Sequence, residues 1–404
     1  MKKLNDKSSA GKRGESVRSD CYIEIQLQKS GGLKLEIKSK VASMYGDSIK
    51  KQIAAMSKFF GIKNANILLE DNGALPFVIA ARFELAVKRL FPEIEKEYLL
   101  PFNKKNFYKS SKDRLRRSRL YLPGNEPKFY LNAGLHKPDG IILDLEDSVS
   151  PSEKDAAQLI VRNALRSVDF YGSERMVRIN QLPRGLNDLK YAVPHNVHII
   201  LIPKCESPEQ VKEVEAEVNK LKKEHKIKNE IYFMPIIESG LGIIKAFEIA
   251  SASKNNCALT IGLEDYTADI GTQRTLEGKE SFFARSMIVN AAKAARIQAI
   301  DTVFSDVSDM DGLLKRVLEA KSLGFEGKGC IHPRQIQVVH KGFEPAPEEI
   351  EKAKKIVNAF EEAEKKGLGV VSIGSKMIDA PVVKRALKTI DLAILNNLLP
   401  KDWK

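Results

Sequence analysis

Residues 140–157, GIILDLEDSVSPSEKDAA, contain one complete unit of the fold that we expect for most of this chain. The apolar run 140–145 has the length and composition of a buried strand. Residues 153–166 then show the spacing of an amphipathic helix, with apolar side chains on one face. A strand followed directly by such a helix is the repeating unit of parallel α/β folds, so the fold depends on how often this unit recurs.

The alternation of strand and helix continues through residues 117–345. Eight such units in roughly 230 residues predict a (β/α)8 TIM barrel, with a doubly wound open sheet as the alternative. Residues 346–404 lie beyond the repeat, and helical spacing at 347–366 predicts a C-terminal helical extension there. The eight strands are predicted at 117–122, 140–145, 176–180, 198–203, 231–237, 258–263, 299–304 and 325–331, with helices at 153–166, 207–222, 281–296 and 309–321 between them.

A smaller unit precedes the barrel at residues 20–92. Two alternating runs, 21–27 and 33–37, are separated by a Gly-Gly turn and predict a β-hairpin. Helical spacing at 46–60 and 74–90, with a third strand at 65–70, completes a small α+β domain. Residues 1–19 are predicted to be a flexible basic tail, and the charged, irregular residues 93–116 a basic linker.

Composition excludes several classes of protein. The 404 residues are 43% hydrophobic and 29% charged, which is typical of a folded globular chain. No apolar run is long enough to span a membrane, and no apolar stretch follows the basic N-terminus as in a secretory signal. The four cysteines lie far apart and form no CxxC pair, which favours a reducing cytoplasm.

The net charge of +13 is concentrated in two stretches. Residues 1–20 hold six Lys and Arg against three Asp and Glu, and residues 101–120 hold eight against one. A nucleic-acid-binding protein more often carries its basic charge on a folded face, so we expect no nucleic-acid partner. The two stretches are either solvated flexible chain or segments that attract the phosphates of a cofactor or an acidic partner.

Polar residues stand at the carboxyl ends of the predicted strands. An α/β barrel carries its active site at that end of the strands. Several carboxylates and one arginine would therefore meet at one barrel mouth, where a hard cation such as Mg²⁺ relieves their repulsion. An arginine at that mouth suits an anionic substrate, because its guanidinium binds a carboxylate through two hydrogen bonds. The residues in question are Asp144, Glu146, Asp147, Arg178, Asn180, Lys204, Glu238, Glu264 and Asp265.

An ordered series of motifs gives the chain a family resemblance over about residues 117–395. The series resembles the citrate lyase β-subunit family of the HpcH/HpaI aldolase and citrate lyase superfamily, whose fold is a (β/α)8 barrel. The resemblance implies a Mg²⁺-dependent lyase that cleaves a citryl thioester to oxaloacetate and an acetyl thioester. The motifs are RSRLYLPGNEPKF, IILDLEDSVSPSEKDAA, VRIN, IPKCESPEQV, PIIESGLGI, IGLEDYTADIG, GFEGKGCIHPRQI and SKMIDAP.

The resemblance also implies roles for particular residues. Glu238 and Asp265 match the direct Mg²⁺ ligands of the family, and Glu146 and Asp147 match the pair that holds the water around the metal. Arg178 matches the arginine that grips the carboxylate of the oxo acid. For Lys204, an active-site role and a structural role both remain open. Two further sets complete the implied site: Arg117 with Pro123, Gly124 and Asn125 at the entrance for the thioester, and Asp379, which in relatives reaches the site of a neighbouring subunit.

The first unit resembles the citrate lyase acyl carrier (γ) subunit through YGDSIKKQI and NGALPFVIAARFELAVKR. That carrier bears a phosphoribosyl-dephospho-CoA arm on a serine just before its first strand. Here the corresponding stretch is GKRGESVRSD (residues 11–20), in which Ser16 and Ser19 both depart from the carrier spacing. Ser19 is favoured over Ser16 as the attachment site, and the carrier-like fold is the firmer inference of the two.

The resemblance implies partners and leaves alternatives open. We expect an acyl-exchanging α-type subunit as a partner, a homo-oligomer, and no membrane. The substrate is carrier-bound, or it is a free CoA thioester such as citramalyl-CoA or malyl-CoA. A non-catalytic scaffold that binds RNA or protein is the alternative from another class.

Overall fold

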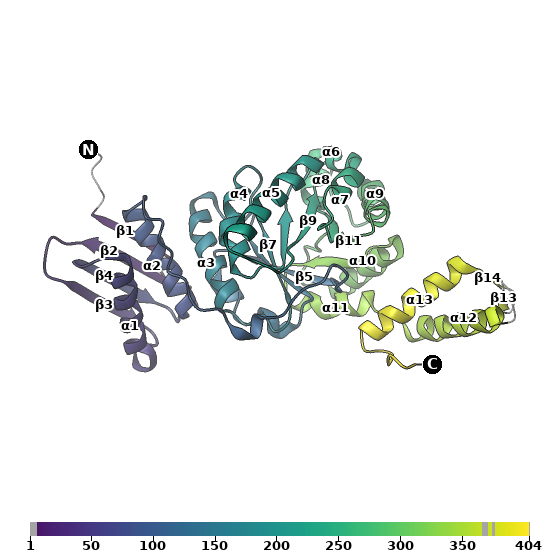
Figure 1. Ribbon diagram of the computed structural model, residues 1–404, viewed down its shortest axis with the longest axis horizontal. Helices are drawn as coiled ribbons and strands as arrows, with labels where there is room; N and C mark the ends of the chain where they lie inside the picture. Colours follow the sequence, from purple (N-terminus) through teal and green to yellow (C-terminus); the bar gives the residue numbers. More distant parts are fainter. Residues whose placement is uncertain (1–5, 366–370, 374–375, 404) are drawn as a thin grey trace.

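The computed structural model describes residues 6–365, 371–373 and 376–403. Three parts follow one another along its long axis: an N-terminal α+β domain, a barrel, and a C-terminal helical hairpin that projects away from the barrel (Figure 1). None of the described helices is long and apolar enough to cross a membrane.

The N-terminal domain is a four-stranded sheet in the order β1-β2-β4-β3, backed by two helices. Its central strands, β2 and β4, pair antiparallel over their full length, and β3 pairs parallel with β4. Together with the helices, the elements are β1 (Lys7–Gly11), β2 (Cys21–Leu27), β3 (Leu33–Ser39), α1 (Ala42–Phe60), β4 (Ala65–Asp71) and α2 (Pro76–Leu90).

The predicted hairpin of residues 21–27 and 33–37 is wrong. In the structure β4 lies between those two strands, because the helix α1 forms a crossover that sets β3 parallel to β4. The exposed, charged β3 suits the edge of the sheet, whereas Ile67 and Leu69 of β4 are buried at its centre. Gly31 and Gly32 make a turn, but the turn joins strands that are not neighbours.

The tail and the linker are also more ordered than predicted. Residues 7–11 form β1, which pairs antiparallel with β2. Residues 103–116 pack across the barrel face where the strands begin, because Asn106 and Arg116 are buried there and Arg116 pairs with Glu174 at 2.8 Å. Much of the basic charge that suggested a flexible linker is therefore used in fixed contacts.

The barrel is closed and parallel, as predicted, with its strands in sequence order from β5 to β12. The predicted strand positions are confirmed to within a few residues. Apolar side chains fill its interior, among them Ile142, Met176 and Leu201. The strands are β5 (Ser118–Pro123), β6 (Gly140–Asp144), β7 (Glu174–Arg178), β8 (Ile199–Ile202), β9 (Tyr232–Ile237), β10 (Ala258–Ile261), β11 (Gln298–Asp301) and β12 (Gly327–Cys330).

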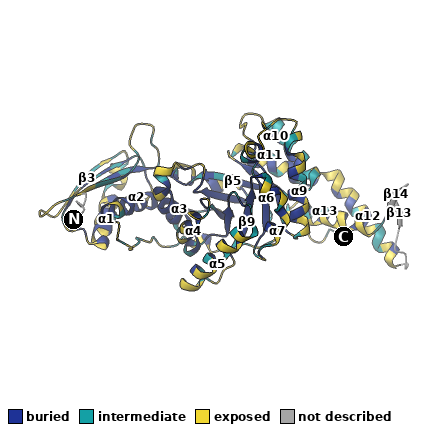
Figure 2. Cartoon of the chain, turned by 90° about the horizontal axis from the view of Figure 1, so that it is seen from above, coloured by how far each residue is buried: buried dark blue, intermediate teal, exposed yellow. Residues whose placement is uncertain are grey.

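Helices surround the barrel and bury a second apolar layer against it (Figure 2). Only short 3₁₀ turns follow β5, at Pro127–Phe129 and Ala133–His136, so the helical layer is thinnest there. The helices are α3 (Lys154–Ser167), α4 (Gly185–Asp188), α5 (Pro208–Glu224), α6 (Gly240–Ile244), α7 (Ala246–Ser251), α8 (Leu263–Asp269), α9 (Lys279–Ala294), α10 (Met310–Leu323) and α11 (Arg334–Phe343).

The N-terminal domain docks firmly on the barrel through α2 and α3. Arg162 of α3 is fully buried and binds both oxygens of the buried Glu84 of α2, at 2.9 and 2.7 Å. Near the edge of the interface, Arg89 pairs with Asp155 at 3.0 Å. Buried charges are tolerated only when they are paired, so this interface has a defined geometry.

The C-terminal segment forms α12 (Pro347–Lys365) and α13 (Ala380–Leu395), which pack on each other around Val357, Ile378 and Ile390. The short strands β13 (Val371–Ile373) and β14 (Lys376–Ile378) lie between the two helices, at the end of the hairpin far from the barrel (Figure 1). The predicted helical extension is present, but it makes a separate small core.

Candidate active site

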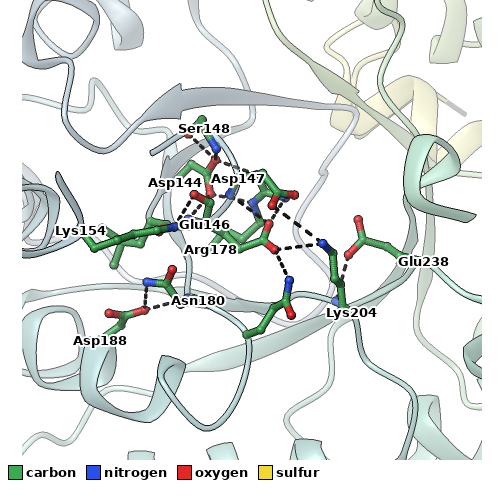
Figure 3. A network of polar contacts seen from close by, with 12 residues as sticks. Asp144, Glu146, Asp147, Ser148, Lys154, Arg178, Asn180, Asp188, Lys204 and Glu238 are labelled. Carbon is green, nitrogen blue, oxygen red and sulfur yellow. Dashed lines mark hydrogen bonds and ion pairs between the residues drawn. The ribbon is translucent and has the colours of Figure 1, made fainter. Parts of the chain in front are cut away.

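The carboxyl ends of β6 and β7 bring an aspartate and an arginine together. Asp144, the last residue of β6, accepts hydrogen bonds from Arg178 Nε and Nη2 at 2.6 and 2.7 Å (Figure 3). Burial alone would raise the pKa of Asp144, but Arg178 and hydrogen bonds from Ser148 and the Glu146 N–H lower it below its ordinary value. Asp144 is therefore an ionised anchor that fixes the arginine.

Arg178 faces two more carboxylates with its remaining nitrogen. Its Nη1 lies 2.7 Å from Glu146 Oε2 and 3.7 Å from Asp147 Oδ2. Burial lowers the pKa of Arg178, but its carboxylate neighbours, Asp144 foremost, outweigh that effect and raise it above the ordinary value. The loop that carries Glu146 is itself fixed, because the Lys154 ammonium donates to the carbonyls of Leu145 and Glu146 at 2.7 and 2.6 Å.

Glu238 follows β9 and is 6% exposed. Burial, reinforced by Asp265 and Glu146, raises its pKa to about 8, although the N–H of Lys204 donates to Oε2 at 2.9 Å and favours the charged form. The carboxylate fits here because residue 262 is glycine: a Cβ at that position would lie 2.3 Å from Glu238 Oε1.

Lys204 is the second cation of the cluster. Its ammonium lies 3.3 Å from Asp265, in the first turn of α8, and 3.7 and 3.8 Å from Glu146 and Asp147. Burial lowers the pKa of Lys204, but the carboxylates raise it above its ordinary value. The backbone of Lys204 has a φ of 45°, in the left-handed region that a lysine seldom adopts.

A cavity of about 390 Å³ at the mouth of the barrel is lined by Asp144, Asp147, Arg178, Glu238 and Asp265. Glu146 and Lys204 pair with these lining residues. The structure thus brings together most of the residues predicted from the strand ends. Asn180 is an exception, because its side chain binds Asp188 at 2.8 Å, and Glu264 borders the cavity but pairs with Arg274.

Sequence reasoning missed several residues that also line the cavity, among them Thr260 of β10 and, on β5, Arg119 and Tyr121. Their signal was alternation: every second residue of β5 points inward, which places Arg119 and Tyr121 inside the barrel.

The donor set fits a hard divalent cation. The cluster holds five carboxylates (Asp144, Glu146, Asp147, Glu238 and Asp265) and two cations, and burial and mutual repulsion raise the pKa of Glu146 and Glu238. Among the described residues no three carboxylate, histidine or cysteine side chains converge closely enough to enclose a metal. Mg²⁺ typically takes one or two protein carboxylates and keeps several waters, a demand that this carboxylate cluster can meet.

Arg117 is not at this mouth, and the prediction for it is wrong. It precedes β5 at the opposite end of the barrel, where its guanidinium binds Asp139 at 2.9 Å and also contacts Glu344 and Asn396. The turn Pro123–Asn125 does lie at the mouth end of the same strand, as the family resemblance implied. A six-residue strand separates its two ends by the thickness of the barrel, so one motif cannot place both ends in one site.

The structure does not bring Asp379 to the mouth of its own barrel. Asp379 caps α13 by accepting a hydrogen bond from the Val382 N–H at 3.2 Å, and it lies next to β14 at the distal end of the C-terminal hairpin (Figure 1). A role in catalysis would therefore require a neighbouring subunit.

The two candidate attachment serines lie in the loop that joins β1 to β2. Ser16 is exposed near the tip of the loop, whereas Ser19 is half-buried, has a φ of 54°, and donates its backbone N–H to the Asn72 carbonyl at 3.0 Å. The same loop touches the barrel, because Lys12 pairs with Glu126 directly after the turn at Asn125. The loop that carries both candidate serines is therefore anchored at Lys12 beside the expected thioester entrance.

Comparison with known proteins agrees with this geometry. The profile of the family described as HpcH/HpaI aldolase/citrate lyase matches residues 117–333, and that of the malonate decarboxylase delta subunit (MdcD), an acyl carrier family, matches residues 10–90. The citrate lyase β subunit of Leuconostoc mesenteroides is 41% identical over 72% of this chain and 97% of its own length. Human mitochondrial citramalyl-CoA lyase is 33% identical over 69% of this chain and 85% of its own.

Solved structures give the same grouping. The CitE protein of Mycobacterium tuberculosis, in complex with magnesium, acetoacetate and coenzyme A, is 28% identical and aligns with a TM-score of 0.59 over 70% of this chain and 99% of that one. The sequence motifs, the closed barrel and the carboxylate cluster at its mouth agree with the family that these matches indicate. This chain belongs to the HpcH/HpaI aldolase/citrate lyase family, with an acyl-carrier-like domain at its N-terminus.

Proposed function

We propose that this protein is a Mg²⁺-dependent carbon–carbon lyase that cleaves a citryl thioester to oxaloacetate and an acetyl thioester. The observation that carries the proposal is the cavity at the barrel mouth, where Arg178 faces a cluster of carboxylates, among which burial raises the pKa of Glu146 and of Glu238. The similarity to citrate lyase β subunits over nearly their whole length supports the same activity.

Arg178 binds the carboxylate on the hydroxyl-bearing carbon of the substrate. Its guanidinium is held by Asp144, so it meets the carboxylate in a fixed orientation and keeps its charge throughout the reaction. Charge that develops on the hydroxyl oxygen lies close to the same guanidinium and is stabilised by it. When the substrate enters, its carboxylate displaces Glu146 from Arg178. Asp144 stays bound to the guanidinium, because it pairs with no other cation among the described residues.

Glu238 and Asp265 are the proposed ligands of Mg²⁺, and Glu146 and Asp147 hold the water around it. The bound cation would supply Lewis-acid polarisation of the substrate's hydroxyl and carboxylate oxygens. Lys204 orients both ligands, through its backbone at Glu238 and its ammonium at Asp265.

The reaction is a retro-aldol cleavage. The hydroxyl proton leaves to a base, the hydroxyl carbon becomes the ketone of oxaloacetate, and the electron pair of the broken bond passes to the α-carbon of the acetyl thioester. That carbon then takes one proton, for which we propose Asp379 of a neighbouring subunit as the donor.

The thioester is either attached to the N-terminal domain or carried by free CoA. Docking of the β1–β2 loop beside Glu126 favours delivery within the chain. We propose Ser16 for the attachment in place of Ser19, which the sequence favoured, because Ser16 is the more exposed of the two. A tethered carrier raises the local substrate concentration without new contacts. Intact mass after coexpression with the modifying enzymes tests this: a pantetheine-type adduct on residues 12–20 supports a carrier, and an unmodified chain contradicts it.

We also propose a homo-oligomer and an acyl-exchanging α-type partner. Large apolar side chains are exposed on adjoining helices beside the barrel: Leu241, Ile244 and Phe247 on α6 and α7, with Phe282 and Phe283 on α9. Exposed apolar patches of this kind typically mark a protein interface. The four cysteines are free and buried, which supports the reducing cytoplasm as the location.

The decisive experiment is cleavage of citryl-CoA, citramalyl-CoA and malyl-CoA by the purified protein with Mg²⁺, following release of oxaloacetate, pyruvate or glyoxylate. Oxaloacetate release supports the proposed reaction. Pyruvate release favours the citramalyl-CoA alternative, which the 33% identity to the human enzyme supports. Absence of all three products, from the protein with and without the attached arm, would refute the lyase.

A further inference from the structure

Arg119 is a buried cation inside the barrel that pairs with no carboxylate of the described residues. Its side chain is 1% exposed, and its guanidinium donates only to neutral atoms among the described residues, Thr260 Oγ1 and Met234 Sδ, both at 3.0 Å. Its Nε is buried and has no hydrogen-bond partner. Burial lowers the pKa of Arg119, which is the mark of a charge that the protein leaves uncompensated.

The other buried arginines show how such a charge can be satisfied: Arg175 has no carboxylate partner among the described residues, but it donates to the Asn196 carbonyl and contacts His198. Arg116 and Arg162 are equally inaccessible, and each is held by a glutamate at 2.8 Å or less. An unpaired buried guanidinium costs free energy, so it persists where something else satisfies it.

Arg119 borders the active-site cavity. The cavity at the barrel mouth is lined by Arg119 and Thr260 as well as by Arg178 and Glu238. Thr260 lies two residues before Gly262, which touches Glu238, so the guanidinium lies one layer of side chains beneath the carboxylate cluster. The neighbours of Arg119 in the sheet are Gly140 and Gly329, and the place that a side chain would take at each is filled by Met176 and by Val303.

Tyr121 connects the two cations of the cavity. Arg178 lies over its ring, with Cζ 5.4 Å from the centroid, and both Arg119 and Arg178 act to lower the pKa of its hydroxyl against the larger effect of burial. The lining of the cavity therefore includes Arg178, which Asp144 engages, and Arg119, which has no carboxylate partner among the described residues.

We propose that Arg119 is a specificity-determining residue that binds a second carboxylate of the substrate. A citryl group has two carboxylates on its oxo-acid half, whereas a citramalyl group has a carboxylate and a methyl. Arg178 takes the carboxylate beside the hydroxyl, and Arg119 takes the one at the end of the chain. This inference rests on the proposed lyase function and narrows its substrate to thioesters that release a dicarboxylic oxo acid.

The test is the ratio of kcat/KM for citryl-CoA to that for citramalyl-CoA, measured in Arg119→Met and in the wild type. Loss of a charge-assisted contact in a buried site is expected to lower the ratio roughly 100-fold. Thr260→Val, which removes the hydroxyl that orients the guanidinium, is expected to lower it several-fold. A ratio that stays within about threefold of the wild type in Arg119→Met overturns the proposal.

Two further variants separate a change in specificity from a loss of folding. Arg175→Met is the matched control, because Arg175 is another fully buried barrel arginine and binds Asn196 and His198 away from the cavity; it should lower the melting temperature and leave the ratio unchanged. If Arg119→Met does not fold, Arg119→Gln replaces it, since the glutamine fills similar space without charge.

A binding measurement separates failure of this inference from failure of the lyase. Calorimetric titration with oxaloacetate and with pyruvate, in Mg²⁺, should show a preference for oxaloacetate that Arg119→Met abolishes. If the wild type cleaves no thioester yet shows that preference and loses it in the variant, the lyase is refuted and the role of Arg119 stands. Equal affinity for both acids in the wild type overturns the role of Arg119 whatever the activity.

Discussion

The ammonium of Lys204 lies 3.3 Å from Oδ1 of Asp265. The backbone N–H of the same lysine holds Glu238, so one residue of the loop after β8 fixes the two carboxylates that we assign to Mg²⁺. That loop bends through a left-handed backbone at Lys204 to make both contacts. Backbone strain of this kind is maintained only where surrounding contacts hold it, which agrees with an active site.

Glu238→Gln and Asp265→Asn should each abolish Mg²⁺-dependent cleavage, a fall of at least about 10³-fold in kcat, while the fold persists. The glutamine oxygen at 238 can still accept the Lys204 N–H, so stability should change little. The measurement is the release of oxo acid against Mg²⁺ concentration. Glu230→Gln, at the opposite end of β9, is the control and should retain activity, since its carboxylate is exposed and pairs with Lys222. Wild-type turnover in either ligand variant would remove the metal assignment.

Arg162→Met should destabilise the protein by about 3–5 kcal/mol, because it leaves the buried Glu84 without its bidentate partner. Chemical denaturation monitored by circular dichroism measures the loss. Lys105→Met removes an exposed pair with Asp169 and should have no measurable effect. Equal midpoints for the two variants would show that the α2–α3 interface does not depend on the buried pair.

Stability should fall as the pH drops below 6.5, and His198 should account for part of the loss. Burial, followed by repulsion from Arg175, lowers its pKa to about 3. The unfolded chain binds the proton first, so this histidine costs nothing above pH 6.5 and about 2 kcal/mol at pH 5. Urea denaturation at pH 7 and pH 5 should therefore show a smaller difference in His198→Asn than in the wild type. An unchanged difference would mean that His198 is protonated in the folded protein.

Ile244→Asp combined with Phe283→Asp should convert the oligomer to monomers, since charge on the exposed patch opposes its burial. Light scattering coupled to gel filtration gives the mass. Lys220→Asp, on the exposed face of α5, is the control for added acidic charge. A monomeric wild type, or an oligomer that survives the double substitution, would place the interface elsewhere.

Inactive Asp379→Asn and inactive Glu238→Gln chains should restore activity when they are mixed. Asp379 lies at the far end of the C-terminal hairpin, so each mixed oligomer would contain some sites with a native barrel and a native Asp379 from a neighbour. Random mixing at equal amounts should return roughly a quarter of wild-type turnover. No recovery after refolding or coexpression would contradict a shared site.

Much of the barrel was predictable because its signals are local. Most strands contain a short apolar run, several are followed by helical spacing, and the polar residues Asp144, Arg178 and Glu238 stand where those runs end. In the N-terminal domain the same approach failed for the hairpin. Pairing of β3 with β4 depends on burial across the whole sheet, which adjacent residues cannot show.

The sequence by itself determined the eight strand–helix units, the family and most of the residues at the barrel mouth, because the length and periodicity of apolar runs and the order of motifs are properties of the chain. Only the tertiary structure decided which end of a strand each charge occupies and what neutralises it. Arg117, expected in the site, pairs with Asp139 at the far end of β5. Arg119, two residues later, points into the barrel and has no carboxylate partner among the described residues, because strand closure buries alternate side chains regardless of their charge.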